Sequence, residues 1–243
     1  MVSRTSEQGD VFFFYRPRVG VDEVDELTDV QQFFVVLAPD GRDLYRRLLV
    51  GRKRLPDPHA HERGWAFVAE VAHSPEDLRA ELRAAPTARA AGEGRYAVVA
   101  HDGERPSDHH THLAYVLELP HEPGPAQEAF RIRPEASYVV AVRNPRADAP
   151  SGTGLRADQR AKYPPDLQER FGDRRFVALD DPRFLDFENA EVVLIGAAED
   201  VESELGTSLD REHERVETAA IVTRLRVRPD DLPLDPLEHG DLR

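Results

Sequence analysis

The chain has 243 residues, 40% hydrophobic and 32% charged, a balance typical of a globular protein with a heavily charged surface. Its formal net charge of −14 should repel nucleic-acid phosphates, so only a local basic patch could bind them. The chain has no cysteine, which excludes disulfides, thiolate nucleophiles and zinc–thiolate sites. No run approaches the roughly 20 apolar residues of a membrane helix. The N-terminus also lacks the apolar core of a signal peptide, so we expect a cytoplasmic protein with no membrane partner.

The first third of the chain has the pattern of β-strands. Residues 11–15 and 33–37 are short apolar runs rich in phenylalanine, and the turn sequence Ala38–Gly41 follows the second run. In such a turn, proline presets one backbone dihedral and glycine supplies the conformation that other residues avoid. Because Leu44–Val50 is apolar again, residues 33–50 predict a β-hairpin. Runs that are apolar at successive positions indicate strands covered on both faces.

The clearest local signal is a helix start. Trp65–Val71 predicts another strand, and Ser74–Asp77 then places a capping hydroxyl, a proline and two acids at the first turn of a helix. Leu78 and Leu82 are four residues apart and give this helix one apolar stripe. The sequence therefore predicts a short helix packed on a sheet.

The remaining chain alternates short apolar runs with polar loops. We expect a linker or mobile loop at residues 144–160, and short helical segments at 164–172 and 199–205. Further strands are predicted at Tyr96–Ala100, Leu113–Leu119, Ser137–Val142, Phe176–Leu179, Val192–Ile195 and Val216–Val227.

Together these elements predict a β-rich α+β protein with about ten short strands and two or three short helices. We divide it into an N-terminal β-rich half (1–100, with the capped helix near 74–85), a C-terminal β-rich half (101–227) and a loosely ordered acidic tail (228–243). Residues 68–82 and 193–205 both read as a strand leading into an acidic helix. A tandem duplication, a chance similarity and a single compact unit all remain open.

Three segments carry a resemblance to other proteins. His110–Pro120, Ser137–Pro145 and Tyr163–Phe171 together resemble a group of uncharacterised prokaryotic proteins, and the likeness extends to Gly9–Tyr15 and Gly51–Pro56. The resemblance implies a folded family that spans most of the chain, and it implies no activity.

Arginines concentrate in one early segment. Residues 41–54 carry six basic side chains and one acid, in a chain whose overall charge is strongly negative. Arginines on one strand face can clamp a phosphate or carboxylate, and nearby aromatics could stack a base or nucleotide. The ordinary alternative is that edge-strand arginines pair with the abundant acids. The candidate ligand-binding residues are Arg16, Arg18, Arg46, Arg47, Arg52 and Arg54, with Phe12, Phe14, Tyr15, Tyr45 and Trp65 as candidate stacking residues.

Histidines concentrate in a second segment. His110 and His112 are two residues apart, so on a strand they share one face, and His101 or Asp108 could complete a metal site with them. Without cysteine, such a site would hold zinc, manganese or iron through nitrogen and oxygen. The ordinary alternative is a group of solvated loop residues, because metal sites usually draw further ligands from distant segments.

These clusters give three hypotheses of function. The first is a non-enzymatic binding module, with no cofactor, that holds an anionic small molecule or nucleic acid on the arginine-rich face. The second is a metal-dependent hydrolase in which a divalent transition metal on His101, Asp108, His110 and His112 activates water. The third is a structural or assembly role in which neither cluster converges. No phosphate loop, serine elbow or dinucleotide fingerprint occurs, so whether the protein is an enzyme stays open.

Overall fold

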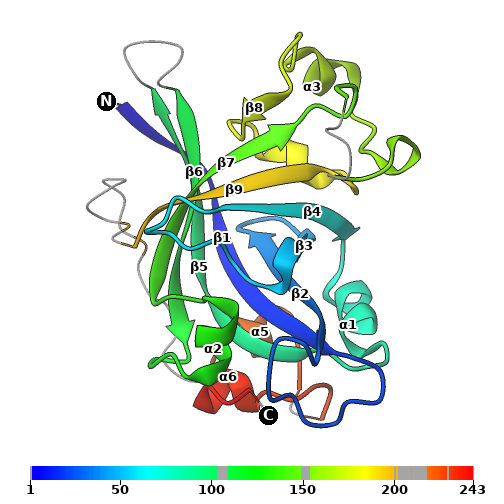
Figure 1. Cartoon of the computed structure of the whole chain (residues 1–243), viewed down its shortest axis with the longest axis vertical. Coiled ribbons are helices and arrows are strands. Elements are labelled where there is room, and N and C mark those ends of the chain that lie inside the picture. Colours follow the sequence, from blue (N-terminus) through cyan, green and yellow to red (C-terminus); the bar gives the residue numbers. More distant parts are fainter. Residues whose placement is uncertain are drawn as a thin grey trace.

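The centre of the molecule is a single antiparallel sheet. The computed structural model describes residues 2–102, 109–148, 154–199, 201, 209, 218–228 and 230–242. The strands are β1 (Val2–Pro17), β2 (Val30–Pro39), β3 (Tyr45–Val50), β4 (Arg63–Ala72), β5 (Arg89–Asp102), β6 (His110–Leu119), β7 (Glu135–Arg143), β8 (Phe176–Ala178) and β9 (Glu191–Ala198). Their order is β6-β5-β1-β2-β3-β4-β9-β7, and a further pairing of β6 with β7 closes these eight strands into a barrel, with β8 added beside β7 (Figure 1).

The predicted fold class, α+β with two β-rich halves as one possibility, is wrong, because the chain is β-rich as expected but forms one closed antiparallel barrel. Strands from residues 1–100 and from residues 101–227 share one barrel, because β4 pairs with β9 and β5 pairs with β6. Across the β4–β9 pair, for example, Ala66 lies opposite Val192. Short apolar patterns indicate the local conformation of each strand but carry no information about pairings between such distant segments.

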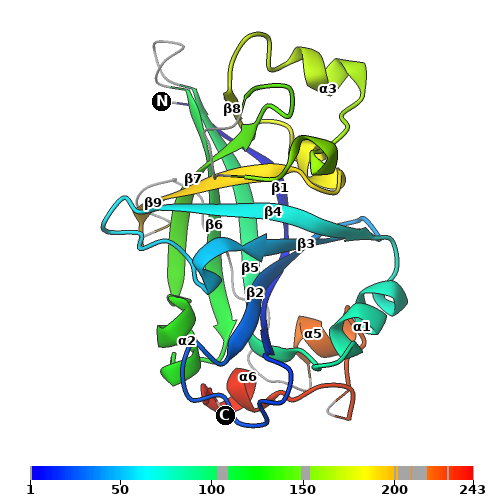
Figure 2. The same ribbon diagram turned by 45° about the vertical axis from the view of Figure 1, so that its right-hand side comes forward.

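The helices are short and lie at the periphery. They are α1 (Pro75–Arg83), α2 (Pro125–Phe130), α3 (Pro165–Glu169), α5 (Ala220–Thr223) and α6 (Asp235–His239), with 3-10 turns η1 (Gly51–Lys53), η3 (Ala157–Gln159) and η4 (Pro182–Asp186). In both views α3 and β8 lie at one end of the barrel, and α2 and α6 lie at the other (Figures 1 and 2). None of the helices in the described ranges is long and apolar enough to cross a membrane.

Strand alternation explains the successive apolar residues of β1. Val11, Phe13 and Tyr15 belong to the core inside the barrel, whereas Phe12 and Phe14 belong to a second core outside it. Helices α1, α5 and α6 contribute to this outer core. The prediction that the early strands are covered on both faces is therefore confirmed.

The helix predicted after Ser74 is also confirmed. It forms α1, whose Leu78 and Leu82 are fully buried in the outer core. The hydroxyl of Ser74 accepts a hydrogen bond from the backbone N–H of Asp77, which satisfies one of the free donors of the first turn.

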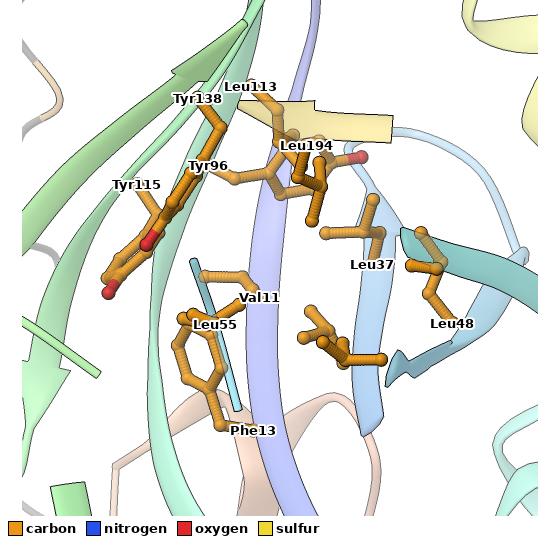
Figure 3. Close-up of a pocket in the computed structure, with 13 residues that line it drawn as sticks. Val11, Phe13, Leu37, Leu48, Leu55, Tyr96, Leu113, Tyr115, Tyr138 and Leu194 are labelled. Carbon is orange, nitrogen blue, oxygen red and sulfur yellow. The ribbon is translucent and has the colours of Figure 1, made fainter. Parts of the chain in front are cut away.

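The barrel interior is filled by side chains. A cavity of about 30 Å³ remains, room for about one water molecule. Figure 3 shows Tyr115 and Tyr138 on one side of this cavity and Leu37 and Leu48 on the other. At one end of the barrel, Phe130 of α2 stacks on Phe33, with ring centroids 4.8 Å apart. The interior is therefore a packed core and not a ligand chamber.

Two C-terminal segments differ from expectation. The predicted strand at 216–227 lies partly outside the described residues, and its described part forms α5 instead. The helix predicted at 199–205 lies almost wholly outside them. The tail expected to be loosely ordered contains α6, and Leu232, Leu234 and Leu237 are buried in the outer core. Its regularly spaced leucines supply the apolar contacts that order it.

Candidate functional site

The central arginine of the predicted basic face points into the barrel. Arg46 alternates with Tyr45 and Arg47 along β3, and its side chain is fully buried. Its Nη1 lies 2.5 Å from Oε1 of Glu7, and its Nε donates to Oδ1 of Asp186 at 2.8 Å. The hydroxyl of Tyr96 donates to the same Glu7 oxygen at 2.8 Å. Arg46 is thus held by two carboxylates inside the protein, and it links β3 to Glu7 of β1 and Asp186 of η4.

Arg16 and Arg47 lie on the outer side of the sheet and hold α1 in place. Each has a guanidinium nitrogen 3.3 Å from Oε1 of Glu81, a residue of α1. Arg16 also donates to the carbonyl oxygen of Pro86 at 2.9 Å. Arg47 pairs with Glu70 at 3.0 Å. Both arginines therefore already have hydrogen-bond or ion-pair partners within the protein.

The other three predicted arginines lie elsewhere. Arg18 is exposed just after β1, Arg52 is exposed in η1 and pairs with Glu62 at 3.1 Å, and Arg54 is half-buried after η1. The six arginines therefore do not converge on one strand face, because alternation and the turn at η1 send them in different directions.

The histidines do come together. Across the β5–β6 pair, His101 lies directly opposite His110, and His112 lies two residues further along β6 on the same face. The three ring centroids are 5.3 Å (His101–His110), 5.1 Å (His101–His112) and 4.9 Å (His110–His112) apart. Asp108, the fourth predicted ligand, lies outside the described residues. In the described ranges no group of three or more His, Asp or Glu side chains is placed so that it could hold a metal ion.

Two of these imidazoles are buried. Burial, with the neighbouring His110 and His101 as a smaller cause, lowers the pKa of His112 to about 3. Burial also lowers the pKa of His101, helped by His110. The Nδ1 of His112 lies 2.7 Å from Oγ of Ser137, whereas Nε2 of His101 is buried without a hydrogen-bond partner among the described residues. Both rings are therefore neutral at neutral pH.

His109 has a different environment from the other three. Its Nε2 lies 2.8 Å from Oδ2 of Asp180 and its Nδ1 lies 3.0 Å from Oδ1 of Asp102. The hydrogen bond to Asp180 is the largest cause that raises the pKa of His109. Thr111 donates to Oδ1 of the same Asp180 at 2.6 Å. His109 thus ties the start of β6 to the segment before η4.

A groove that the sequence did not predict lies on the outer face of four strands. Trp65 on β4 pairs with Val193 on β9, which in turn pairs with Ala141 on β7. These three side chains, with Ile195, form an apolar floor, and Phe176 of β8 adds a second aromatic ring whose centroid is 5.9 Å from that of Trp65. The groove has a volume of about 360 Å³, within the range of small-molecule sites.

Three arginines surround this apolar floor. Arg63 and Arg175 are exposed, and neither forms an ion pair within the part of the chain that the structure describes. Arg143 is buried, and its Nη1 lies 3.0 and 2.9 Å from the two carboxylate oxygens of Glu191. Its Nη2 has no hydrogen-bond partner among the described residues. Asp148 lines the groove as well. The arrangement offers an apolar, partly aromatic surface with two exposed guanidinium groups beside it, those of Arg63 and Arg175.

A glycine allows the loop beside the groove to cover the Arg143–Glu191 pair. Gly154 has a φ of +79°, and a Cβ at this position would lie 2.1 Å from Nη1 of Arg143. The next residue, Leu155, donates its backbone N–H to Oε1 of Glu191 at 2.9 Å. Any larger residue at 154 would therefore displace the buried ion pair.

Of the groove residues, only Trp65 is among the candidate stacking aromatics that the sequence predicts. The alternation of Arg63 with Trp65 and of Ala141 with Arg143 places each pair on one strand face. This two-residue spacing shows which residues of one strand share a face, but it does not show that β4, β9, β7 and β8 lie side by side. Comparison of the chain with protein-family models, curated proteins and solved structures finds no match.

Proposed function

We propose that the protein is a non-enzymatic binding module that holds a small planar organic anion in the groove over Trp65 and Phe176. The observation that carries this proposal is the juxtaposition of two neighbouring, accessible aromatic rings with Arg63 and Arg175, which have no ion-pair partner among the described residues. Most other arginines of the described chain have carboxylate partners, for example Arg46 and Arg183. These two are therefore available to a ligand.

The chemistry of the groove favours an anion attached to a flat ring. Trp65 and Phe176 present π-surfaces tilted 55° from each other, so a planar ring can stack on one of them, a contact worth ~1–3 kcal/mol. A guanidinium binds a phosphate or carboxylate through two parallel hydrogen bonds, each stronger than a bond between neutral groups. Because the chain carries a net charge of −14, this local group of cations gives an anion a specific place to bind.

The proposal can be tested directly because Trp65 is the only tryptophan of the chain. Its fluorescence therefore reports on the groove alone. We expect a saturable fluorescence change on titration with adenosine monophosphate or salicylate, which carry a phosphate and a carboxylate on planar rings. Neutral adenosine should bind more weakly, and affinity for the anions should fall with added salt because exposed charges are screened.

Substitutions then locate the site. Arg175→Ala and Arg63→Ala should each weaken anion binding about 10-fold or more, since a hydrogen bond to a charged group is worth ~1.5–3 kcal/mol. Arg18→Ala is the matched control, because Arg18 is also an exposed arginine but lies outside the groove. A weaker affinity in Arg18→Ala with no change in Arg175→Ala would move the site to the arginines of the first strands. The absence of any saturable response to either anion would overturn the proposal.

A further inference from the structure

The histidine cluster on the outer face of β5 and β6 lies apart from the groove and has no role in the proposed function. Its geometry follows from strand register. Direct opposition of His101 and His110, and the two-residue spacing of His110 and His112, place three rings on one face. Ala97, Val99 and Ala114 lie on the same face and form a small apolar cluster with Val201. The three imidazoles thus sit at the edge of an apolar floor.

The spacing of the rings is that of three imidazoles around one metal ion. Zinc binds histidine nitrogens at ~2.0–2.1 Å with tetrahedral angles, which places the ring centroids about 5 Å apart. The three observed separations are 4.9, 5.1 and 5.3 Å. As the described side chains are placed, the three rings do not form a group that could hold a metal ion, so binding requires at least one ring to turn. Rotation of His110 about its Cβ–Cγ bond, a torsion that is broad in histidine, turns its nitrogens while leaving its ring centre almost in place. The contacts of His101 with Ser3 and of His112 with Ser137 are kept in this rearrangement.

A buried nitrogen in the cluster lacks a partner. His101 is 6% exposed, and its Nε2 is buried with no hydrogen bond to any described residue. An unsatisfied buried polar atom costs about 1–3 kcal/mol and calls for an explanation. Nδ1 of the same ring lies 3.4 Å from Oγ of Ser3 on β1, the strand on the other side of β5 from β6. Nε2 is therefore the nitrogen left for a ligand.

The imidazole of His112 is held by a hydrogen bond to Ser137. Nδ1 of His112 lies 2.7 Å from Oγ of Ser137, a buried residue of β7. Metal-binding histidines usually use one ring nitrogen for the metal and the other for such a hydrogen bond, which fixes the orientation of the ring. The contact with Ser137 leaves Nε2 of His112 for a metal.

We propose that His101, His110 and His112 bind one divalent transition metal ion of the zinc type through three imidazole nitrogens. The all-nitrogen ligand set suits Zn²⁺, Co²⁺ or Ni²⁺. Three protein ligands leave the fourth tetrahedral position to a water molecule or another oxygen ligand.

The test uses the full chain without a histidine tag, stripped of metal with a chelator and dialysed. Titration calorimetry with Zn²⁺ should give one ion per chain, and Co²⁺ should give the intense visible absorption of a tetrahedral complex. His110→Ala removes the half-buried member of the cluster, and it should weaken Zn²⁺ binding at least ~10-fold and abolish the Co²⁺ band. His239→Ala removes a histidine whose side chain is 65% exposed and lies on α6, and it should leave both measurements unchanged.

A second variant keeps all three imidazoles. Ser137→Ala removes only the partner of His112, and it should weaken Zn²⁺ binding ~10-fold or more, the usual effect of losing an orienting hydrogen bond. Thermal unfolding in the presence of chelator shows whether each variant is folded before the affinities are compared. Absence of bound Zn²⁺ in the folded wild-type protein would overturn the proposal. An affinity that His110→Ala leaves unchanged, or that His239→Ala lowers equally, would overturn it too.

Discussion

Glu93 provides a pH-dependent test of how the C-terminal segment is held. Its side chain is fully buried, with Oε1 accepting from the backbone N–H of Ala220 at 3.0 Å and Oε2 from that of Ile221 at 2.8 Å. Glu93 therefore caps α5 from β5. Substitution to glutamine keeps the size of the side chain and removes its titration.

Burial is the largest cause that raises the pKa of Glu93, from its ordinary value of 4.5 to about 7. The two backbone hydrogen bonds lower it, and the nearby Glu118 and Asp10 raise it further. Since the folded state favours the protonated form, this contribution to stability is complete below pH 4.5 and is lost as the pH rises to about 7. A difference of roughly 2.5 pKa units corresponds to about 3 kcal/mol of unfolding free energy.

The assay is urea denaturation of the wild-type protein and Glu93→Gln at pH 5 and pH 8. The wild-type protein should lose about 2–3 kcal/mol more than the variant between these two pH values, because other titrating groups act equally in both proteins and Glu93 of the unfolded chain is already partly ionised at pH 5. The variant should be the more stable of the two proteins at pH 8, because it avoids the cost of burying an ionised carboxylate. Equal losses in the two proteins would show that Glu93 does not titrate in this range and would refute the reasoning.

Two further substitutions test the packing described above. Arg46→Met should lower the free energy of unfolding by about 3 kcal/mol in chemical denaturation, because Glu7 and Asp186, which are mostly buried, would keep only the exposed Arg42 as an ion-pair partner. A loss below about 1 kcal/mol would mean that water or relaxation compensates the two carboxylates. Ser74→Ala should cost about 1 kcal/mol in the same measurement, since the N–H of Asp77 loses its acceptor. Unchanged stability there would show that the cap contributes nothing in this context.

Local signals in the sequence predicted local structure well. The turn at Ala38–Gly41 joins β2 to β3, and Gly41 adopts a φ of +68°, the conformation expected of glycine there. Ser74 caps α1 as its sequence position indicates. Each of these features depends on residues a few positions apart, so the chain carries the information within one short window.

Features that depend on distant pairing could not be predicted. The alternation on β3 shows that Arg46 and Arg47 face opposite sides, but only closure of the barrel decides which side is the interior. The two-residue spacing of His110 and His112 indicates that they share a strand face. The position of His101 opposite His110, by contrast, depends on the register between β5 and β6. The groove needs four strands in order, and no short pattern links Trp65 to Phe176.

Long-range closure also shapes how such a chain can fold. The hydroxyl of Tyr15, near the end of β1, donates to the carbonyl oxygen of Leu242 at 2.7 Å, a contact between residues 227 positions apart. The barrel itself closes through β9, which pairs with a strand more than a hundred residues earlier in the chain. Proteins dominated by such non-local contacts fold in milliseconds to seconds, more slowly than helical proteins of similar size. During synthesis, β1 is made first, but most of the chain must follow before both faces of this phenylalanine-rich strand can be covered.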